Sequence, residues 1–160
     1  MAARPRDPNI SALLRGPHSA FIAQLHRGLS AAGYADIHPA HYIVFQHLRN
    51  EGSRLTDLAE RAQITKQLMN YLVNHLEGRG YLQRVPDPTD GRARLVRFTA
   101  RGRGLERAAE EIISRIEAEW EVRLGTRQMG QLRRILTRLG NTLQTPPGAA
   151  AATFGESRKH

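Results

Sequence analysis

The chain has 160 residues, a length that favours one domain or two small lobes around a modest core. Its formal net charge of +9 favours a polyanionic partner, although a membrane surface would also suit that charge. The absence of cysteine excludes disulfides, thiolate metal sites and cysteine-based redox sensing; no apolar run approaches the roughly 20 residues of a membrane span, so the cytoplasm is the expected location.

The N-terminal part of the chain is predicted to be an arm followed by a helix. Residues 1–9 contain two prolines and few apolar side chains, so we expect a disordered arm. Apolar positions from Ile10 onward then indicate helix within residues 10–35, although Gly16 and Pro17 should bend or restart it. The long part is expected from about His18 to Ala32, with Gly33 ending it.

Two short helices are predicted next. His38 and Pro39 open the first of them, and Gly52 closes it. Thr56 is expected to cap the second, with Asp57 in its first turn. Their apolar stripes are Ala40, Val44, Phe45 and Leu48 in the first helix, and Leu55, Leu58, Ala59 and Ala62 in the second.

A third helix follows after a tight connection, from Lys66 to about Arg79 with Thr65 as its cap. Its inward face is predicted to hold Leu68, Met69, Leu72, Val73 and Leu76, and its outward face Lys66, Gln67, Asn70, Tyr71 and Asn74. Two helices joined by a short turn match a helix-turn-helix, in which Asn and Gln can pair bidentately with adenine. The alternative is a polar face that is only solvated.

The region after this helix is predicted to be a β-hairpin. Strand-forming residues stand on both sides of the polar turn Pro86–Gly91. The hairpin and the residues just beyond it carry Arg84, Arg92, Arg94, Arg97, Arg101 and Arg103. Alternate strand residues share a face, so Asp90 could hold one guanidinium while another reaches DNA. A helix-turn-helix with such a wing predicts a sequence-specific DNA-binding protein; the alternative is a solvated charged hairpin.

The C-terminal part is predicted to be two helices. Thr99 should cap a long helix over residues 100–124 with the stripe Leu105, Ala109, Ile112, Ile116 and Trp120, widened by Ile113. After Gly125, a helix over residues 125–143 places Met129, Leu132, Ile135, Leu136, Leu139 and Leu143 on one face. Such stripes favour a symmetric dimer with a shared core, or alternatively a fold-back onto the same chain. Residues 144–160 are expected to be a disordered tail.

The hairpin segment Asp87-Pro-Thr-Asp90-Gly-Arg92-Ala-Arg94, the following Leu95–Thr99 and the preceding Leu76–Tyr81 resemble the MarR family of winged helix-turn-helix regulators. The resemblance covers roughly residues 19–143. It implies a mainly α fold with a small β-hairpin wing, in which residues 36–100 form the DNA-binding lobe, 100–124 a connecting helix, and 10–35 with 125–143 the dimerisation helices. It also implies a homodimer on a pseudo-palindromic operator in double-stranded DNA, usually repressing nearby genes and often released by a small ligand.

The resemblance also implies roles for particular residues. The recognition-helix positions that face the major groove are Thr65, Lys66, Gln67, Asn70, Tyr71 and Asn74. Arg92 corresponds to the wing tip in the minor groove, and Asp90 with Arg94 to a pair that stiffens the wing. Gly91 departs from the family pattern, because many members carry a larger residue there. Ligand-pocket positions match His18, Phe21, Tyr34, His41, Phe45 and Trp120, which are alternatively ordinary core residues.

Two other classes of function are alternatives for this sequence. Six histidines, His18, His26, His38, His41, His47 and His75, raise the idea of an enzyme or a metal-dependent sensor. No carboxylate pair, nucleophile constellation or glycine-rich phosphate loop accompanies them, so we predict no catalytic residue, metal or cofactor. A non-specific, chromosome-organising protein is the other alternative, and it would bind any duplex alike.

Overall fold

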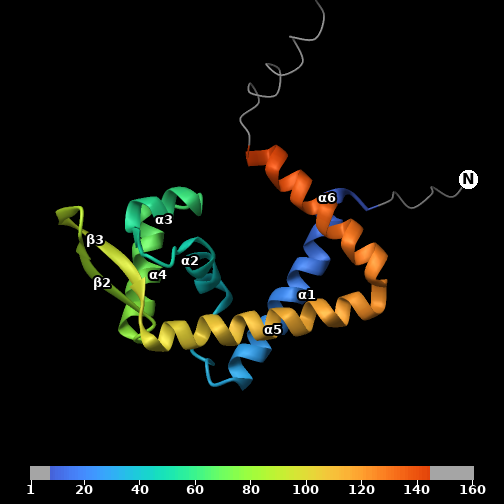
Figure 1. The fold of residues 1–160 in the computed structure, drawn as a ribbon, viewed down its shortest axis with the longest axis horizontal. Helices are drawn as coiled ribbons and strands as arrows, with labels where there is room; N and C mark the ends of the chain where they lie inside the picture. Colours follow the sequence, from blue (N-terminus) through green and yellow to red (C-terminus); the bar gives the residue numbers. More distant parts are fainter. Residues whose placement is uncertain (1–7, 145–160) are drawn as a thin grey trace, which may run out of the picture. The chain divides into compact units, whose positions relative to one another are not determined.

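The computed structural model describes residues 8–144. Its elements are α1 (Ile10–Ala31), the 3-10 turn η1 (Pro39–His41), α2 (Tyr42–His47), β1 (Ser53–Arg54), α3 (Leu55–Arg61), α4 (Lys66–Gly78), β2 (Leu82–Asp87), β3 (Asp90–Phe98), α5 (Ala100–Leu124) and α6 (Thr126–Gln144) (Figure 1). The predicted mainly α fold with a hairpin wing is confirmed. The expected arm and tail lie outside the described residues, except for residues 8, 9 and 144.

The chain divides within α5 into two compact units, one that ends at Ile116 and one that begins at Glu117. The first unit contains α1 to β3 and most of α5. The second contains the end of α5 and all of α6.

Helix α1 begins at Ile10, where the apolar pattern indicated helix, and it is continuous. The Asn9 side chain accepts a hydrogen bond from the Ala12 N–H at 2.9 Å, and the helix then continues through Pro17 to Ala31. The expected restart of the helix at Gly16 and Pro17 is therefore wrong. Proline removes one hydrogen bond of the helix, and the surrounding turns are exposed, so water can satisfy the carbonyl that is left free. The expected end is confirmed, because Gly33 follows with φ of 93°.

The core of the first unit lies where α4 packs against α2 and α3. Its fully buried aliphatic side chains include Ile37, Val44, Leu58, Met69, Val73 and Leu76.

Three predicted details are wrong. Ala40 is exposed and Tyr42 is buried in its place, since the segment opens as a 3-10 turn that rotates the buried face. Arg54 and not Thr56 is the N-cap of α3, because that helix begins at Leu55.

Leu68 is the third exception, because it is 46 % exposed although it was predicted on the inward face. It lies in the first turn of α4, at the edge of the stripe formed by Met69, Leu72, Val73 and Leu76. The 3.6-residue period of the helix places Leu68 beside that stripe. Whether a side chain at the edge of an apolar stripe is buried depends on which other helix or strand packs there.

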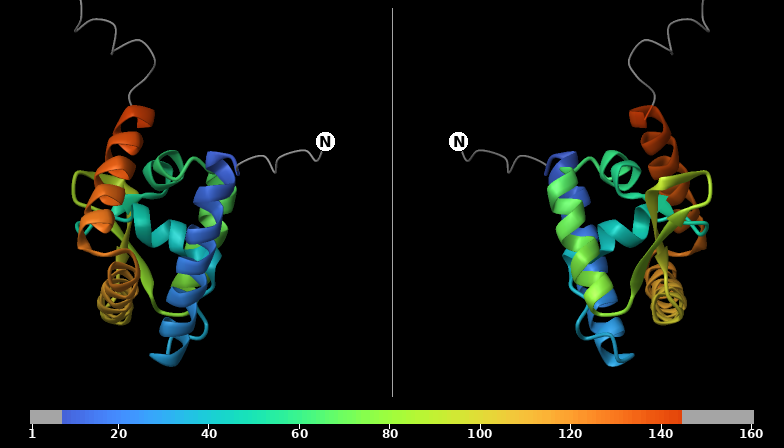
Figure 2. Two further views of the ribbon diagram at one scale, coloured as in Figure 1. Left: turned by 90° about the vertical axis from the view of Figure 1, so that its right-hand side faces the viewer. Right: turned by 90° about the vertical axis from the view of Figure 1, so that its left-hand side faces the viewer.

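The wing is a three-stranded antiparallel sheet in the order β1-β3-β2. The short strand β1 was not predicted; its Ser53 pairs with Val96 and its Arg54 with Leu95. Strands β2 and β3 are longer than expected, so the connecting turn consists of Pro88 and Thr89 only. Figure 2 shows this hairpin from both sides as a twisted ribbon.

The hairpin is irregular near its tip. Pro86 pairs with Arg94 but Asp87 pairs with Asp90, so residues 91–93 form an irregularity of β3. Extra residues of this kind bend a strand and redirect its side chains. The alternation expected for Asp90, Arg92 and Arg94 therefore does not apply here.

The start of α5 is held against the end of α4. The Thr99 hydroxyl accepts a hydrogen bond from the Gly102 N–H at 3.1 Å, which confirms the predicted cap. Tyr81 is fully buried, and its hydroxyl donates to Asp36 Oδ1 at 2.6 Å. Arg101 donates to Asp36 Oδ2 at 3.2 Å. These contacts join the loop after α1 to the start of α5.

Apolar side chains remain exposed on the two terminal helices. On α1 these are Ile10, Leu13 and Leu14, and on α6 they are Leu132, Ile135, Leu136, Leu139 and Leu143. The α6 residues lie on the one face that the sequence predicted, and their exposure ranges from 36 % to 76 %. Each helix therefore presents an apolar surface to solvent in the single chain.

Candidate nucleic-acid interface

Helices α3 and α4 form a helix-turn-helix with a tight connection. Gln63 in the turn has a φ of 53°, and its side chain donates to the Glu60 carbonyl at 3.1 Å. The left-handed conformation is uncommon for a residue other than glycine, and here it reverses the chain within a few residues. Thr65 then caps α4, as predicted, by accepting from the Leu68 N–H at 3.2 Å. Its hydroxyl is thus engaged in holding the start of α4.

The predicted groove-facing residues lie together on the outer side of α4. Lys66, Gln67, Tyr71 and Asn74 are exposed, and Asn70 is half-buried. Tyr71 is 66 % exposed, so its phenol ring is accessible to a partner. The face offers amide, ammonium and phenol groups, the chemistry that can read base edges and contact phosphates.

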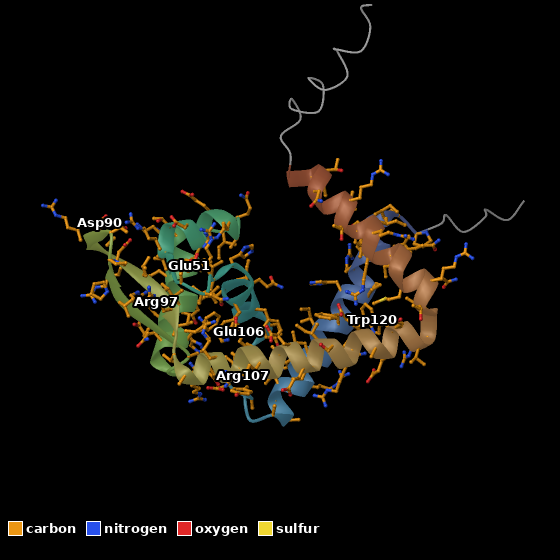
Figure 3. All side chains as sticks on the ribbon, viewed as in Figure 1. Glu51, Asp90, Arg97, Glu106, Arg107 and Trp120 are labelled. Atoms are coloured by element: carbon orange, nitrogen blue, oxygen red, sulfur yellow. The ribbon has the colours of Figure 1, made fainter. Side chains whose placement is uncertain are left out.

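Most arginines of the hairpin region are engaged within the protein. Arg84 donates to α4, Arg97 to the Glu51 carbonyl at 2.7 Å (Figure 3), Arg101 to Asp36 and Arg103 to Asn50 at 2.8 Å. Among the six arginines named from the sequence, and within residues 8–144, only Arg92 and Arg94 have guanidinium groups without a protein partner. Both side chains are exposed on β3, so these two cations are available to a polyanion.

The turn end of the wing is held by Arg54 of β1. Arg54 donates to Asp87 Oδ2 through Nε at 2.8 Å and through Nη2 at 2.6 Å, and Nη2 also lies 3.4 Å from Asp90 Oδ2. Hydrogen bonds from the Thr89 hydroxyl and N–H, together with that from Arg54, lower the pKa of Asp87 to about 2. Asp90 lies near the turn in Figure 3, and its partner is Arg54. The expected pair of Asp90 with Arg94 does not form.

The physical reason for this different pairing is the irregular register of the hairpin. It places Asp90 opposite Asp87, on the side where β1 adds Arg54 to the sheet. Strand β1 is only two residues long, so no alternating pattern in the sequence indicated it. The sequence therefore did not indicate that Arg54 pairs with Asp87. It did not indicate the partners of Arg84 on α4 either, since these also lie far from Arg84 in the chain.

A cavity of about 220 Å³ lies within the first unit, between α1, α2, the end of β3 and α5. Its lining is mostly apolar and includes Phe21, Leu25, Tyr42, Phe45, Phe98, Leu105 and Ile113. Gln46, Glu106 and Glu110 are the polar residues of the lining. Arg103 pairs with Glu106 at 2.7 Å, so that carboxylate is already partly neutralised. A single-ring compound fits a cavity of this size, since about 150 Å³ suffices for benzene.

Of the six residues proposed for a ligand pocket, the cavity brings together Phe21 and Phe45. His18 is exposed on α1, and Tyr34 lies beside Tyr81 with ring centroids 6.2 Å apart. His41 is buried and stacks on His75 of α4 at 4.6 Å. Trp120 belongs to the second unit. The other lining residues carry ordinary helical core patterns, which do not distinguish a cavity wall from a packed core.

His41 belongs to a group of neighbouring histidines. Its ring lies 5.6 Å from His38, and its Nδ1 accepts a hydrogen bond from the His38 N–H at 3.0 Å. Burial, and then the charges of His75, His38 and Arg79, lower the pKa of His41 to about 4. Within residues 8–144, no set of three or more His, Asp or Glu side chains has the geometry to hold a metal ion.

The fold and this surface define a winged helix-turn-helix, a class in which the second helix of the motif enters the major groove. A family model described as the MarR family matches residues 35–93. The HTH-type transcriptional repressor Rv2887 of Mycobacterium tuberculosis is 32 % identical over 93 residues, which are 58 % of this chain and 67 % of that protein. The repressor Mb2911 of Mycobacterium bovis matches to the same extent.

Solved structures agree with this assignment. The Mycobacterium tuberculosis MarR family protein Rv2887 in complex with salicylic acid is 26 % identical, with a TM-score of 0.64 over 84 % of this chain and 98 % of that one. Apo MarR from E. coli shares the fold, with a TM-score of 0.67 at 16 % identity over 84 % and 98 %.

The chain therefore belongs to the MarR family of winged helix-turn-helix transcriptional regulators, and it is a regulator and not an enzyme. Regulators of this family bind DNA as dimers. Among the described helices, none combines the length and the apolar character that crossing a membrane requires.

Proposed function

We propose that the protein is a homodimeric repressor that binds a pseudo-palindromic operator in double-stranded DNA. One observation carries this proposal: the exposed polar face of α4 is adjacent in the same unit to a wing whose Arg92 and Arg94 have no protein partner. The first feature suits base edges in the major groove, and the second suits phosphates or the minor groove. Both mycobacterial relatives are named as repressors, which supports the direction of regulation. A DNA-bound regulator also suits the cytoplasm.

The dimer would form through the apolar surfaces of the terminal helices. Five leucine and isoleucine side chains of α6 are exposed on one face, and three more apolar side chains are exposed near the start of α1. Burying them against a second copy would remove this surface from water, and a two-fold axis would present two α4 helices about 34 Å apart. The proposed division therefore assigns residues 36–100 to DNA, 100–124 to the connection, and 10–35 with 125–143 to dimerisation.

A small aromatic effector is proposed for the cavity beside α2. Rv2887 has been crystallised with salicylic acid and with p-aminosalicylic acid, and the apolar walls here fit a single ring. The lining contains Glu106 and Glu110 and no lysine or arginine. A neutral aromatic ligand would thus be favoured over a carboxylate, because an anion would face the charge of Glu110, whereas Glu106 is already paired with Arg103.

The test of operator binding is a titration of the purified protein at several fixed salt concentrations. Duplexes taken from its own upstream genomic DNA would compete against a random duplex of equal length. Specific recognition should separate the two by about 4 to 10 kcal/mol, whereas a purely electrostatic binder would bind both alike and lose affinity steeply with salt. Equal binding to operator candidates and to genome-wide fragments would contradict the proposal.

A matched pair of variants connects this test to the wing. Arg92→Ala should weaken operator binding and leave the dimer intact, because the side chain is exposed and has no partner in the fold. Arg97→Ala removes an arginine of the same strand whose guanidinium already contacts Glu51, so it should change DNA affinity less. Unchanged affinity in Arg92→Ala would argue against contact between the wing tip and DNA.

A further inference from the structure

Arg84 connects the wing to three successive turns of the recognition helix. From β2, its Nη2 donates to Asn70 Oδ1 at 3.0 Å and to Asn74 Oδ1 at 2.7 Å. Its Nη1 pairs with Glu77 Oε2, and its backbone N–H donates to Glu77 Oε1 at 3.2 Å. The three acceptors are spaced four and three residues apart, so they lie along one side of α4.

The chemistry of the guanidinium determines how the two asparagines are turned. Arginine has only donors, so the carboxamide atom that faces it must be the oxygen and not the nitrogen. The Nδ2 amide of each asparagine is therefore directed away from Arg84 within the carboxamide plane. Hydrogen bonds from a charged donor are about twice as strong as neutral ones, so Arg84 holds both side chains in this orientation.

This orientation changes what the helix can read. Bidentate recognition of adenine requires an asparagine to accept from N6 and to donate to N7 at the same time. Arg84 occupies one acceptor position on each oxygen and turns both oxygens toward β2, so the groups that the two asparagines direct to the groove are their Nδ2 donors. Their natural counterparts are base edges that present acceptors, such as N7 and O6 of guanine and O4 of thymine.

We propose that Arg84 is a positioning residue that sets the base preference of α4 by holding Asn70 and Asn74 as donors. The proposal rests on the proposed entry of α4 into the major groove. Arg84 itself is not assigned a phosphate contact, because Glu77 compensates its charge and its Nη groups are in use. Its replacement together with Glu77 should consequently leave the salt dependence of binding unchanged.

The test is selection of bound sequences from a library of randomised duplexes by the full-length protein. The variant is Arg84→Met with Glu77→Gln, which keeps the apolar stem and leaves no unpaired carboxylate. Positions read by the two asparagines are first identified as those whose preference is lost in Asn70→Ala and in Asn74→Ala. At these positions the wild type should select guanine or thymine, and the double variant should shift toward adenine by about tenfold in relative affinity.

A second variant protects the test against a folding defect. Arg84→Lys keeps the charge beside Glu77, but its single ammonium group cannot bridge both asparagines in the same way, so adenine should gain at one position. Circular dichroism and the dimer mass would verify the fold of each variant. The same motif from wild type and both variants, or adenine already preferred by the wild type, would overturn this inference alone. If the wild-type protein enriches no sequence from the library, both this inference and the proposed function are wrong.

Discussion

Arg54 and Asp87 meet in a two-pronged ion pair next to the turn of the wing, with Arg54 Nε at 2.8 Å and Nη2 at 2.6 Å from the same carboxylate oxygen. The Asp87 side chain is only 5 % exposed, so this pair is well shielded from water on the acid side. Because β1 is only two residues long, this pair with the last residue of β2 adds to the attachment of β1 to the hairpin.

Replacement of Asp87 tests this attachment. Asp87→Ala should lower the urea midpoint of unfolding, since it leaves the Thr89 N–H without its acceptor and leaves Arg54 with only the more distant Asp90. Asp90→Ala is the matched control, because Asp90 is more exposed and lies farther from Arg54, so its midpoint should fall less. The folded pKa of Asp87, about 2, lies below its usual 3.8, so its contribution is present above pH 3.8 and is lost as pH falls through about 2. Equal midpoints for the two variants would contradict this account of the wing.

Gly102 is expected to be irreplaceable by alanine. A Cβ at this position would lie 2.1 Å from the Tyr81 carbonyl oxygen, a backbone atom that can move only if α5 shifts away from the sheet. Gly102→Ala should therefore lower the free energy of unfolding by about 2 kcal/mol or more. Gly78→Ala, at a helical position with nothing within 4 Å, should instead raise it by about 0.5 to 1 kcal/mol. Chemical denaturation of both variants would show whether the two changes have opposite signs.

Protonation of His41 should destabilise the fold. The unfolded histidine takes up a proton near pH 6.5, but the folded one does so only near pH 4. The unfolded state therefore binds more protons between these values, so stability should fall as pH is lowered from 6.5 to 4 and this effect should level off below that. The loss from this group alone is on the order of 3 kcal/mol at most.

The corresponding measurement is the urea stability of wild type and His41→Asn across this pH window. Asparagine retains an acceptor for the His38 N–H but does not titrate. The variant should show a shallower pH dependence, with the remaining slope owed in part to His75, whose pKa burial and Arg79 also lower. Parallel curves for the two proteins would mean that His41 is not the group responsible.

The exposed face of α6 predicts the assembly state. Leu136→Glu with Leu139→Glu should dissociate the dimer, because each buried leucine contributes about 2 kcal/mol in each subunit and a buried charge costs more. Arg127→Glu with Arg134→Glu introduces the same groups on the opposite side of the helix and should leave the dimer intact. Sedimentation equilibrium would give both masses. A monomeric wild-type protein would contradict the proposed dimer before any substitution is made.

The sequence by itself determined the local structure and the family. Periodic apolar residues with capping Thr65 and Thr99 predicted α4 and α5 closely, because both signals act over a few residues. The motif around Asp87 to Arg94 was sufficient to recognise a wing. Gly33 and Gly125 marked helix ends, since their positive φ values suit a residue without a side chain.

Only the tertiary structure decided which polar groups meet. Arg84 reaches Asn70 and Asn74, and Arg54 reaches Asp87, across 10 to 33 positions of the chain. The irregular register of β3 replaced the expected partner of Asp90, and the cavity selected Phe21 and Phe45 from six candidates. Such pairings depend on how separate elements pack against one another, and a local pattern carries no information about that packing. For this reason the sequence could count six arginines in the hairpin region but not say which are engaged. The fold engages Arg84, Arg97, Arg101 and Arg103 within the protein, and among these six it leaves the guanidinium groups of Arg92 and Arg94 without a partner in the described part of the chain.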